Sequence, residues 1–331
     1  MFVKQHRAGS AVLFFLAVSL PLASRTVRDY RFYTAIATSR RDHRAAIVLR
    51  KFRLDGRTCY LLLDPDDLTT AIRPADGLGL KTAAWSALER RFHDTAYFMA
   101  LRDATANESA IQNAGLTHLR SSPPGVVLTV DLCPSRRPLD RELFMEIIRE
   151  FGREEKPVPI AVAVTGVWME EHPPDIEFLE GLERAGDISV TWINHSYHHR
   201  WDKSLPLKEN FLLEKGTDVP AEILQTEAAM IEHGLTPSAF FRFPGLVSDK
   251  KLVVTVESFG LVPVGSDAWL GKNQRPEEGS IVLVHANGNE PIGIARFLKL
   301  IREERENILR RHWLLLDLRE ATVLQEKKIS P

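Results

Sequence analysis

Short apolar runs alternate with amphipathic helical segments from residue 126 to the end of the chain. The runs are four or five residues long, rich in β-branched and aliphatic side chains, and fall at 126–130, 160–164, 188–192, 239–242, 261–264, 281–284 and 313–316. Strands that read as continuous apolar runs joined by helices are typical of a parallel sheet covered on both faces. This number of units favours a distorted (β/α) barrel of seven to eight parallel strands, with an open doubly wound sheet as the alternative.

The chain before these runs follows a different pattern. Two segments rich in strand-forming residues, 45–53 and 58–63, flank the turn Asp55-Gly56 and predict a hairpin. Residues 85–101 show apolar side chains at three- and four-residue steps, which predicts a helix. The sequence therefore predicts a smaller α+β region over residues 25–120, for which it indicates no function.

A cluster of turn-forming residues, Ser-Ser-Pro-Pro-Gly at 121–125, marks the expected boundary, so that the barrel occupies residues 121–331. Residues 25–120 carry a net charge of +5 and residues 121–331 a net charge of −8. The basic region either docks on the acidic one or meets an anionic polymer. Because no basic cluster has interleaved aromatic residues, nothing points to nucleic acid.

Residues 1–24 have the outline of a secretory signal peptide, with a basic start followed by an apolar run over 11–22. That run is too short to span a bilayer, so no membrane span is expected after cleavage. We therefore expect a secreted or periplasmic protein. Cys59 and Cys133 are the two cysteines, and they form either one disulfide or two free thiols.

Polar residues follow the apolar runs at the ends where a parallel barrel carries its chemistry. They are Asp131 after the first run, His195 and His199 after the third, Arg242 at the end of the fourth, Asp267 and Trp269 after the fifth, and His285 after the sixth. Each has an ordinary structural reading: a helix cap for Asp131, a surface partner for Arg242, a satisfied buried histidine for His285, and solvent-facing loop residues for the histidine pair.

Together these residues have a chemical logic. The four-residue spacing of His195 and His199 places two imidazoles on one face of a helical turn, which suits a divalent metal. A metal held in this way activates water, a carboxylate accepts the proton of that water, and an opposing histidine protonates the leaving group. The set predicts a metal-assisted hydrolase of an amide or ester.

Residues 126–318 resemble the polysaccharide deacetylase family, carbohydrate esterase family 4. Five blocks carry the resemblance in family order: Thr129-Val130-Asp131-Leu132-Cys133-Pro134-Ser135, His195-Ser196-Tyr197-His198-His199, Arg242-Phe243-Pro244-Gly245, Asp267-Ala268-Trp269 and Leu283-Val284-His285. The resemblance implies a distorted barrel of seven or eight strands. It also implies a hydrolase that removes acetyl groups, mainly N-acetyl groups, from a glycan by means of metal-bound water, with zinc as the metal and cobalt or nickel as alternatives.

The resemblance also implies a role for each matched residue. These roles are general base for Asp131, general acid for His285, metal ligands for His195 and His199, orientation of Asp131 for Arg242, oxyanion donor for the Gly245 N–H, acetyl-pocket wall for Trp269, and tuning of His285 for Asp267.

Leu132 departs from the family pattern, because it stands where the family usually has a second aspartate that is the third metal ligand. Asp131 or Cys133 would have to take up that place. Two further functions therefore stay open. One is a catalytically impaired glycan-binding or scaffolding protein that keeps the barrel, and the other is an amidase acting on something other than sugar. The substrate, the protein partners and the oligomeric state are not indicated.

Overall fold

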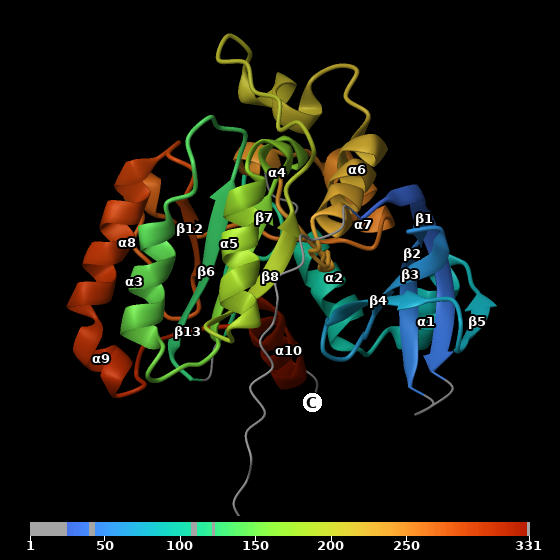
Figure 1. The fold of residues 1–331 in the computed structure, drawn as a ribbon, viewed down its shortest axis with the longest axis horizontal. Coiled ribbons are helices and arrows are strands. Elements are labelled where there is room, and N and C mark those ends of the chain that lie inside the picture. Colours follow the sequence, from blue (N-terminus) through green and yellow to red (C-terminus); the bar gives the residue numbers. More distant parts are fainter. Residues whose placement is uncertain (1–24, 40–43, 107–110, 121–122, 330–331) are drawn as a thin grey trace, which may run out of the picture.

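The computed structural model describes residues 25–39, 44–106, 111–120 and 123–329. The expected signal peptide, residues 1–24, lies outside the described residues. Two sheets form the molecule, an antiparallel sheet near the amino end and a parallel sheet that follows it (Figure 1). In the part of the chain that the structure describes, no helix combines the length and the apolar character that crossing a membrane requires.

The antiparallel sheet has the strand order β4-β3-β2-β1-β5. Its strands are β1 (Val27–Ser39), β2 (Ala45–Leu54), β3 (Arg57–Leu63), β4 (Thr70–Pro74) and β5 (Leu78–Thr82). The predicted hairpin is confirmed as β2 and β3, joined through Asp55 and Gly56, which have φ of 49° and 81°. Asp and Gly tolerate this left-handed conformation better than other residues.

Two helices, α1 (Trp85–Phe92) and α2 (Ala96–Ala106), occupy the segment predicted as one helix. The interruption lies at Thr95, whose backbone N–H and hydroxyl both donate to the carbonyl of Phe92, at 3.0 and 2.6 Å. A side-chain hydroxyl that binds a nearby carbonyl competes with the helical pattern, which explains the break.

The second sheet is parallel throughout and has the strand order β10-β9-β8-β7-β6-β12-β11, with β13 also paired to β6. Its strands are β6 (Gly125–Leu132), β7 (Val158–Val164), β8 (Ile188–Asn194), β9 (Phe240–Phe241), β10 (Val262–Pro263), β11 (Ala268–Trp269), β12 (Ile281–His285) and β13 (Leu314–Leu315). This architecture confirms the expected distorted (β/α) barrel. The two-residue β11 was not predicted, because it is too short to form an apolar run.

Residues 112–119, which precede the expected domain boundary, cross the open side of the parallel sheet, where Leu116 pairs with Val264, just after β10, and His118 pairs with Ser280, just before β12. Leu116 donates its N–H to the carbonyl of Pro263 at 3.0 Å and accepts from the N–H of Gly265 at 2.7 Å. Gly115 allows this approach, because a Cβ there would lie 2.4 Å from the carbonyl oxygen of Pro263. The segment therefore contributes to the wall of the barrel.

Helices cover the outside of the parallel sheet, and Figure 1 shows α3, α5 and α8 lying against its strands. The helices that follow β6 in the chain are α3 (Arg141–Phe151), α4 (Gly166–Glu171), α5 (Pro173–Arg184), α6 (Val219–Glu232), α7 (Lys250–Ser258), α8 (Pro291–Glu303), α9 (Arg305–Leu309) and α10 (Leu318–Ile329). Short 3₁₀ turns are η1 (Leu207–Glu209), η2 (Phe211–Leu213), η3 (Pro244–Leu246) and η4 (Leu270–Lys272). Asp140 caps α3 by accepting from the N–H of Leu143 at 3.2 Å.

The antiparallel sheet and the barrel share one apolar core, in which Ile47 and Tyr97 pack in the same cluster as Val127 and Val262. A buried ion pair adds to this contact, because Arg50 of β2 binds Glu227 of α6 through two hydrogen bonds of 2.6 and 2.8 Å. Both side chains are fully buried.

Candidate functional site

The candidate site lies at the carboxyl ends of β6 and β12, which are neighbouring strands. Asp131 pairs with His285 in the parallel register of these two strands. The chain leaving β8 carries His195, and the chain leaving β9 carries Arg242. Because carboxyl ends of parallel strands share one rim, residues from distant parts of the sequence meet here.

Asp131 is held by Arg242. The Nη1 group of Arg242 donates to Oδ1 of Asp131 at 3.2 Å, and its Nη2 group donates to the carbonyl of Gly265 at 3.0 Å. Burial lowers the pKa of Arg242, and the negative charge of Asp131 opposes that effect. The other carboxylate oxygen, Oδ2, lies 3.6 Å from Nε2 of His195. Asp131 therefore has a fixed orientation and one oxygen toward the histidine pair.

His195 and His199 lie on a loop and not on the helical turn that their spacing predicted. The chain turns back through left-handed backbone at Ser196, with φ of 66°, and at His199, with φ of 49°. These conformations bring the two rings into an edge contact with centroids 4.8 Å apart. Non-glycine residues with positive φ store strain and cluster at functional sites.

Glu222 of α6 holds this loop in place through three hydrogen bonds. One of its oxygens accepts from the backbone N–H groups of Tyr197 and His198 at 2.8 and 2.9 Å, and the other binds Nδ1 of His198 at 2.6 Å. His198, the middle histidine of the motif, therefore has a structural partner. Sequence reasoning missed Glu222, because nothing in its local spacing connects it to the histidine loop.

His195 is prepared to offer one ring nitrogen to a ligand. Its Nδ1 hydrogen-bonds the backbone carbonyl of Arg242 at 2.8 Å, which assigns the proton to Nδ1 and leaves the lone pair on Nε2. Burial lowers the pKa of His195, and the charge of Asp131 opposes that effect. The lowered pKa favours the neutral imidazole, which is the form that binds metals.

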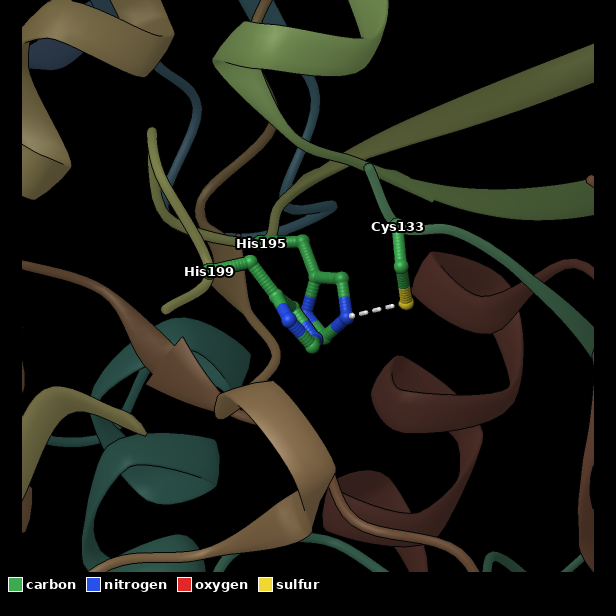
Figure 2. Close-up of side chains that lie close together, drawn as sticks. All are labelled: Cys133, His195 and His199. Atoms are coloured by element: carbon green, nitrogen blue, oxygen red, sulfur yellow. Dashed lines mark hydrogen bonds between the residues drawn. The ribbon is translucent and has the colours of Figure 1, made fainter. Parts of the chain in front are cut away.

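Cys133 lies next to both histidines, and Figure 2 shows the three side chains converging. Its Sγ is 3.6 Å from Nε2 of His195. Ligand atoms of Cys133, His195 and His199 all lie within 4.8 Å of one another. Nε2 of His199 is buried and makes no hydrogen bond to the described residues. A buried unpartnered nitrogen beside two further donors fits a metal ion.

Leu132 faces away from this group. Successive side chains of a strand point to opposite faces, so Leu132 points away from the face that carries Asp131. Its side chain is fully buried in the outer apolar core, in the same cluster as Phe144 and Val164. Leu132 therefore does not approach the histidines.

His285 lies between Cys133 and Glu290. Its Nδ1 is 3.2 Å from Oε2 of Glu290, and the same oxygen accepts from Nε1 of Trp269 at 2.7 Å. Burial alone would lower the pKa of His285, but hydrogen bonds with Cys133 and Glu290 outweigh it and raise the pKa to about 10. Burial alone would raise the pKa of Cys133, but His199 and His285 lower it to about 7.

Trp269 lies close to His285, with ring centroids 5.8 Å apart. The side chain of Lys272 covers the indole, with Nζ 3.7 Å from the ring centroid. The structure thus brings Trp269 to the site.

Asp267 is not brought to His285. Its carboxylate binds Nδ1 of His118 at 2.7 Å and accepts from the N–H of Ile281 at 3.0 Å. Ile281 begins β12 and His285 ends it, so Asp267 lies at the opposite end of the strand. Glu290, five residues after His285 and just before α8, occupies the place expected for Asp267.

Gly245 lies in η3 with φ of 61°. A Cβ at this position would lie 2.5 Å from Cζ of Phe211, whose ring also packs on His199 with centroids 5.4 Å apart. Glycine is therefore required by both the backbone conformation and the close approach of Phe211.

No protein-family model matches the sequence. Among solved structures, the chain is similar to a family 4 carbohydrate esterase from Streptomyces lividans in complex with acetate, with a TM-score of 0.41 and 17% identity over 59% of this chain and 93% of that chain. A peptidoglycan deacetylase from Bacillus subtilis has a TM-score of 0.40 and 16% identity over 62% of this chain and 93% of that chain. A family 4 pseudoenzyme from Bacillus anthracis has a TM-score of 0.41 and 15% identity over 61% of this chain and 66% of that chain. The esterase and the pseudoenzyme belong to carbohydrate esterase family 4, the family that the sequence motifs resemble.

Proposed function

We propose that the protein is a metal-dependent hydrolase that removes acetyl groups, above all N-acetyl groups, from a glycan. The observation that carries the proposal is the meeting of Asp131, the His195–His199 loop and His285 at one rim of the barrel. A carboxylate, an imidazole pair and an opposing imidazole are the groups that hydrolysis of an amide requires.

The metal would be held by His195 and His199, with zinc as the proposed ion and cobalt or nickel as alternatives. A bound divalent cation acts as a Lewis acid toward a carbonyl oxygen and makes water a stronger acid. The hydrogen bond from His195 Nδ1 to the carbonyl of Arg242 keeps that ring oriented for binding.

The protein's own groups would move the protons. Asp131, oriented by Arg242, accepts a proton from the attacking water. His285, with a pKa of about 10, is protonated at neutral pH and donates to the leaving nitrogen. The N–H of Gly245 would donate to the developing oxyanion, and Trp269 would form a wall of the acetyl pocket.

The proposal includes a location outside the cytoplasm, either secreted or periplasmic. It is supported by the signal-like sequence of residues 1–24. Fusion of these residues to a reporter enzyme would test it. Export of the reporter is the expected result, and retention in the cytoplasm would contradict it.

Acetate release by the full chain tests the activity, with N-acetylglucosamine oligomers and peptidoglycan as substrates and zinc or cobalt added. We expect release from at least one substrate and a loss of roughly 100-fold or more in Asp131→Asn. Asp76→Asn, an exposed change in the turn between β4 and β5, is the matched control and should release acetate at the wild-type rate. A metal-loaded protein that releases no acetate from any of these substrates would contradict the proposal.

A second candidate function is a catalytically impaired glycan-binding or scaffolding protein. Burial of Leu132 in the outer core favours it, because the family's carboxylate ligand is then missing. Co-sedimentation with insoluble peptidoglycan or chitin distinguishes the two functions. Binding without acetate release would support the scaffold, whereas release from a simple acetylated peptide but from no sugar would indicate the amidase that acts on other substrates.

A further inference from the structure

We propose that Cys133 is the third protein ligand of the metal, so that this chain has a Cys-His-His site in place of a carboxylate and two histidines. The inference rests on the proposed metal-dependent function and names the ligand set of that same site. It assigns a chemical role to a buried thiol that hydrolysis itself does not use.

The positions of the ligand atoms carry the inference. Sγ of Cys133 lies 3.6 Å from Nε2 of His195. Bond lengths of about 2.3 Å to sulfur and about 2.05 Å to nitrogen, in a tetrahedral site, place those two atoms roughly 3.6 Å apart. His199 completes the group, because its ligand atom lies within 4.8 Å of the other two.

The buried nitrogen of His199 is a second, independent observation. Its Nε2 is shielded from solvent and makes no hydrogen bond within the described chain. Buried side-chain nitrogens are almost always partnered, so this one indicates a ligand that the protein itself does not supply. The backbone around it is strained, with φ of 49° at His199, and strain of this kind persists where function requires a fixed geometry.

The neighbouring carboxylate is less suited to this place. Asp131 is bound through Oδ1 to the fully buried guanidinium of Arg242, which is itself fixed to the carbonyl of Gly265. Moving Asp131 to a metal would leave the guanidinium buried and without its charge partner, which is unfavourable. Cys133 is not bound to a buried guanidinium: its carbonyl accepts from the side chain of Asn287, and its sulfur faces the histidines.

A thiolate and two imidazoles define the metals that the site takes. Soft and borderline donors favour zinc and cobalt, whereas magnesium, calcium and manganese prefer oxygen donors. Cys133 binds as the thiolate, so any proton still on its sulfur leaves when the sulfur–metal bond forms. The site should therefore take zinc or cobalt in the presence of excess magnesium.

Cobalt substitution of the full chain tests the ligand set, because a thiolate bound to Co²⁺ gives an intense near-ultraviolet charge-transfer band that histidine ligands do not give. We expect this band in the wild-type protein and its loss in Cys133→Ser, while weaker visible bands show that cobalt stays bound by the histidines. Cys59→Ser is the matched control, because it removes the other buried cysteine, and it should keep the band.

Three results would overturn the inference. Cobalt bound to the wild-type protein without the charge-transfer band excludes Cys133 as a ligand but leaves the proposed hydrolase intact. A band that survives in Cys133→Ser does the same. A wild-type protein that binds neither cobalt nor zinc removes both the ligand assignment and the metal-dependent function.

A measurement on the unaltered protein covers the case in which Cys133→Ser does not fold. X-ray absorption at the zinc edge of the loaded wild-type chain should show one sulfur at about 2.3 Å together with nitrogen or oxygen neighbours at about 2.0 Å. A shell of nitrogen and oxygen alone would contradict the Cys-His-His site.

Discussion

The imidazole of His285 meets a thiol on one side and a carboxylate on the other. Hydrogen bonds with Cys133 and Glu290 raise its pKa to about 10 in spite of its burial. Burial alone would raise the pKa of Glu290, but hydrogen bonds from His285 and Trp269 lower it. Glu290 therefore carries a negative charge that both orients His285 and keeps it protonated.

Replacing Glu290 by Gln should lower the pKa of His285, because the neutral amide no longer stabilises the imidazolium. In the proposed reaction a general acid with a lower pKa loses its proton at lower pH, so the alkaline limb of the activity profile should move toward neutral pH. We expect kcat to fall roughly 10-fold to 100-fold with a smaller change in KM. NMR titration of His285 checks the pKa shift independently of activity.

Asp267→Asn is the matched control for this prediction. Asp267 binds His118 and the N–H of Ile281 at the far end of β12, so its replacement should leave the titration of His285 unchanged. A shift of His285 in Asp267→Asn together with none in Glu290→Gln would show that the contact with Glu290 has no influence on this imidazole.

Residues of the site differ in how far the sequence could predict them. Asp131, Arg242 and His285 follow apolar runs, and the ends of parallel strands meet at one rim, so their meeting could be expected. Glu222 and Glu290 could not be found in this way, because each acts by contact across the fold and has no characteristic spacing. The helical turn expected for the histidine pair was wrong, since the left-handed backbone of Ser196 and His199 has no sequence signal.

At the scale of elements, the short strand β13 joins the barrel through groups at the amino ends of the strands. The N–H of Leu315 donates to Oε2 of Glu155 at 2.8 Å, and the N–H of Leu316 donates to the carbonyl of Val126 at 2.9 Å. Burial raises the pKa of Glu155 from 4.5 to about 7, although Leu315 and Arg311 oppose the shift.

Glu155 should make stability depend on pH. Between pH 4.5 and 7 the folded protein keeps a proton on Glu155 that the unfolded chain has lost, so the free energy of unfolding falls as the pH rises through this window. Glu155→Gln removes this dependence, because its amide is neutral and its oxygen still accepts from Leu315. Calorimetry measures the Tm of Glu155→Gln minus the Tm of wild type at each pH. This difference should be more positive at pH 8 than at pH 5.

The exposed change Glu89→Gln on α1 provides the comparison and should shift Tm equally at both pH values. Parallel curves for wild type and Glu155→Gln between pH 5 and pH 8 would contradict the raised pKa.

Elements were predicted where a pattern extended over several turns or a whole strand. The hairpin of β2 and β3 has a local signal in the sequence and is confirmed. Helices α8 and α9 are separated at Glu304, a break that the apolar spacing of the sequence does not reveal. Strands of two residues, such as β11, are set by their neighbours in the sheet and lack a pattern of their own.

At the scale of the whole molecule, the antiparallel sheet is attached to the barrel by apolar packing and by the buried pair of Arg50 and Glu227. Arg50 also donates to the carbonyl of Phe259 at 2.7 Å, and the hydroxyl of Tyr30 donates to Glu227 at 3.0 Å. This network satisfies both charges within the interface. The alternation of apolar runs could predict the barrel. Nothing in the sequence of the hairpin, however, indicates that Arg50 binds α6.

Arg50→Met should destabilise the protein by about 3–5 kcal/mol, because it leaves the carboxylate of Glu227 buried without its partner. The double variant Arg50→Met/Glu227→Met should recover much of that loss, since both charges are then removed. Urea unfolding followed by circular dichroism measures the two effects.

Arg53→Met, an exposed change on the same strand, should alter stability by less than about 0.5 kcal/mol. A double variant as unstable as the sum of its single changes would show that the pair does not act as a unit.

The run of residues 112–119 along the opening of the parallel sheet has a consequence for any shortened form of this protein. A chain begun at residue 121 would lack this segment, which links the end of β10 to the start of β12. The carbonyl of Pro263 and the N–H of Gly265 would then lose their hydrogen-bond partners in Leu116 and become available to pair with a neighbouring chain. Residues 112–119 thus cover this edge of the sheet. A chain shortened to begin at residue 121 should aggregate under conditions in which the full chain does not.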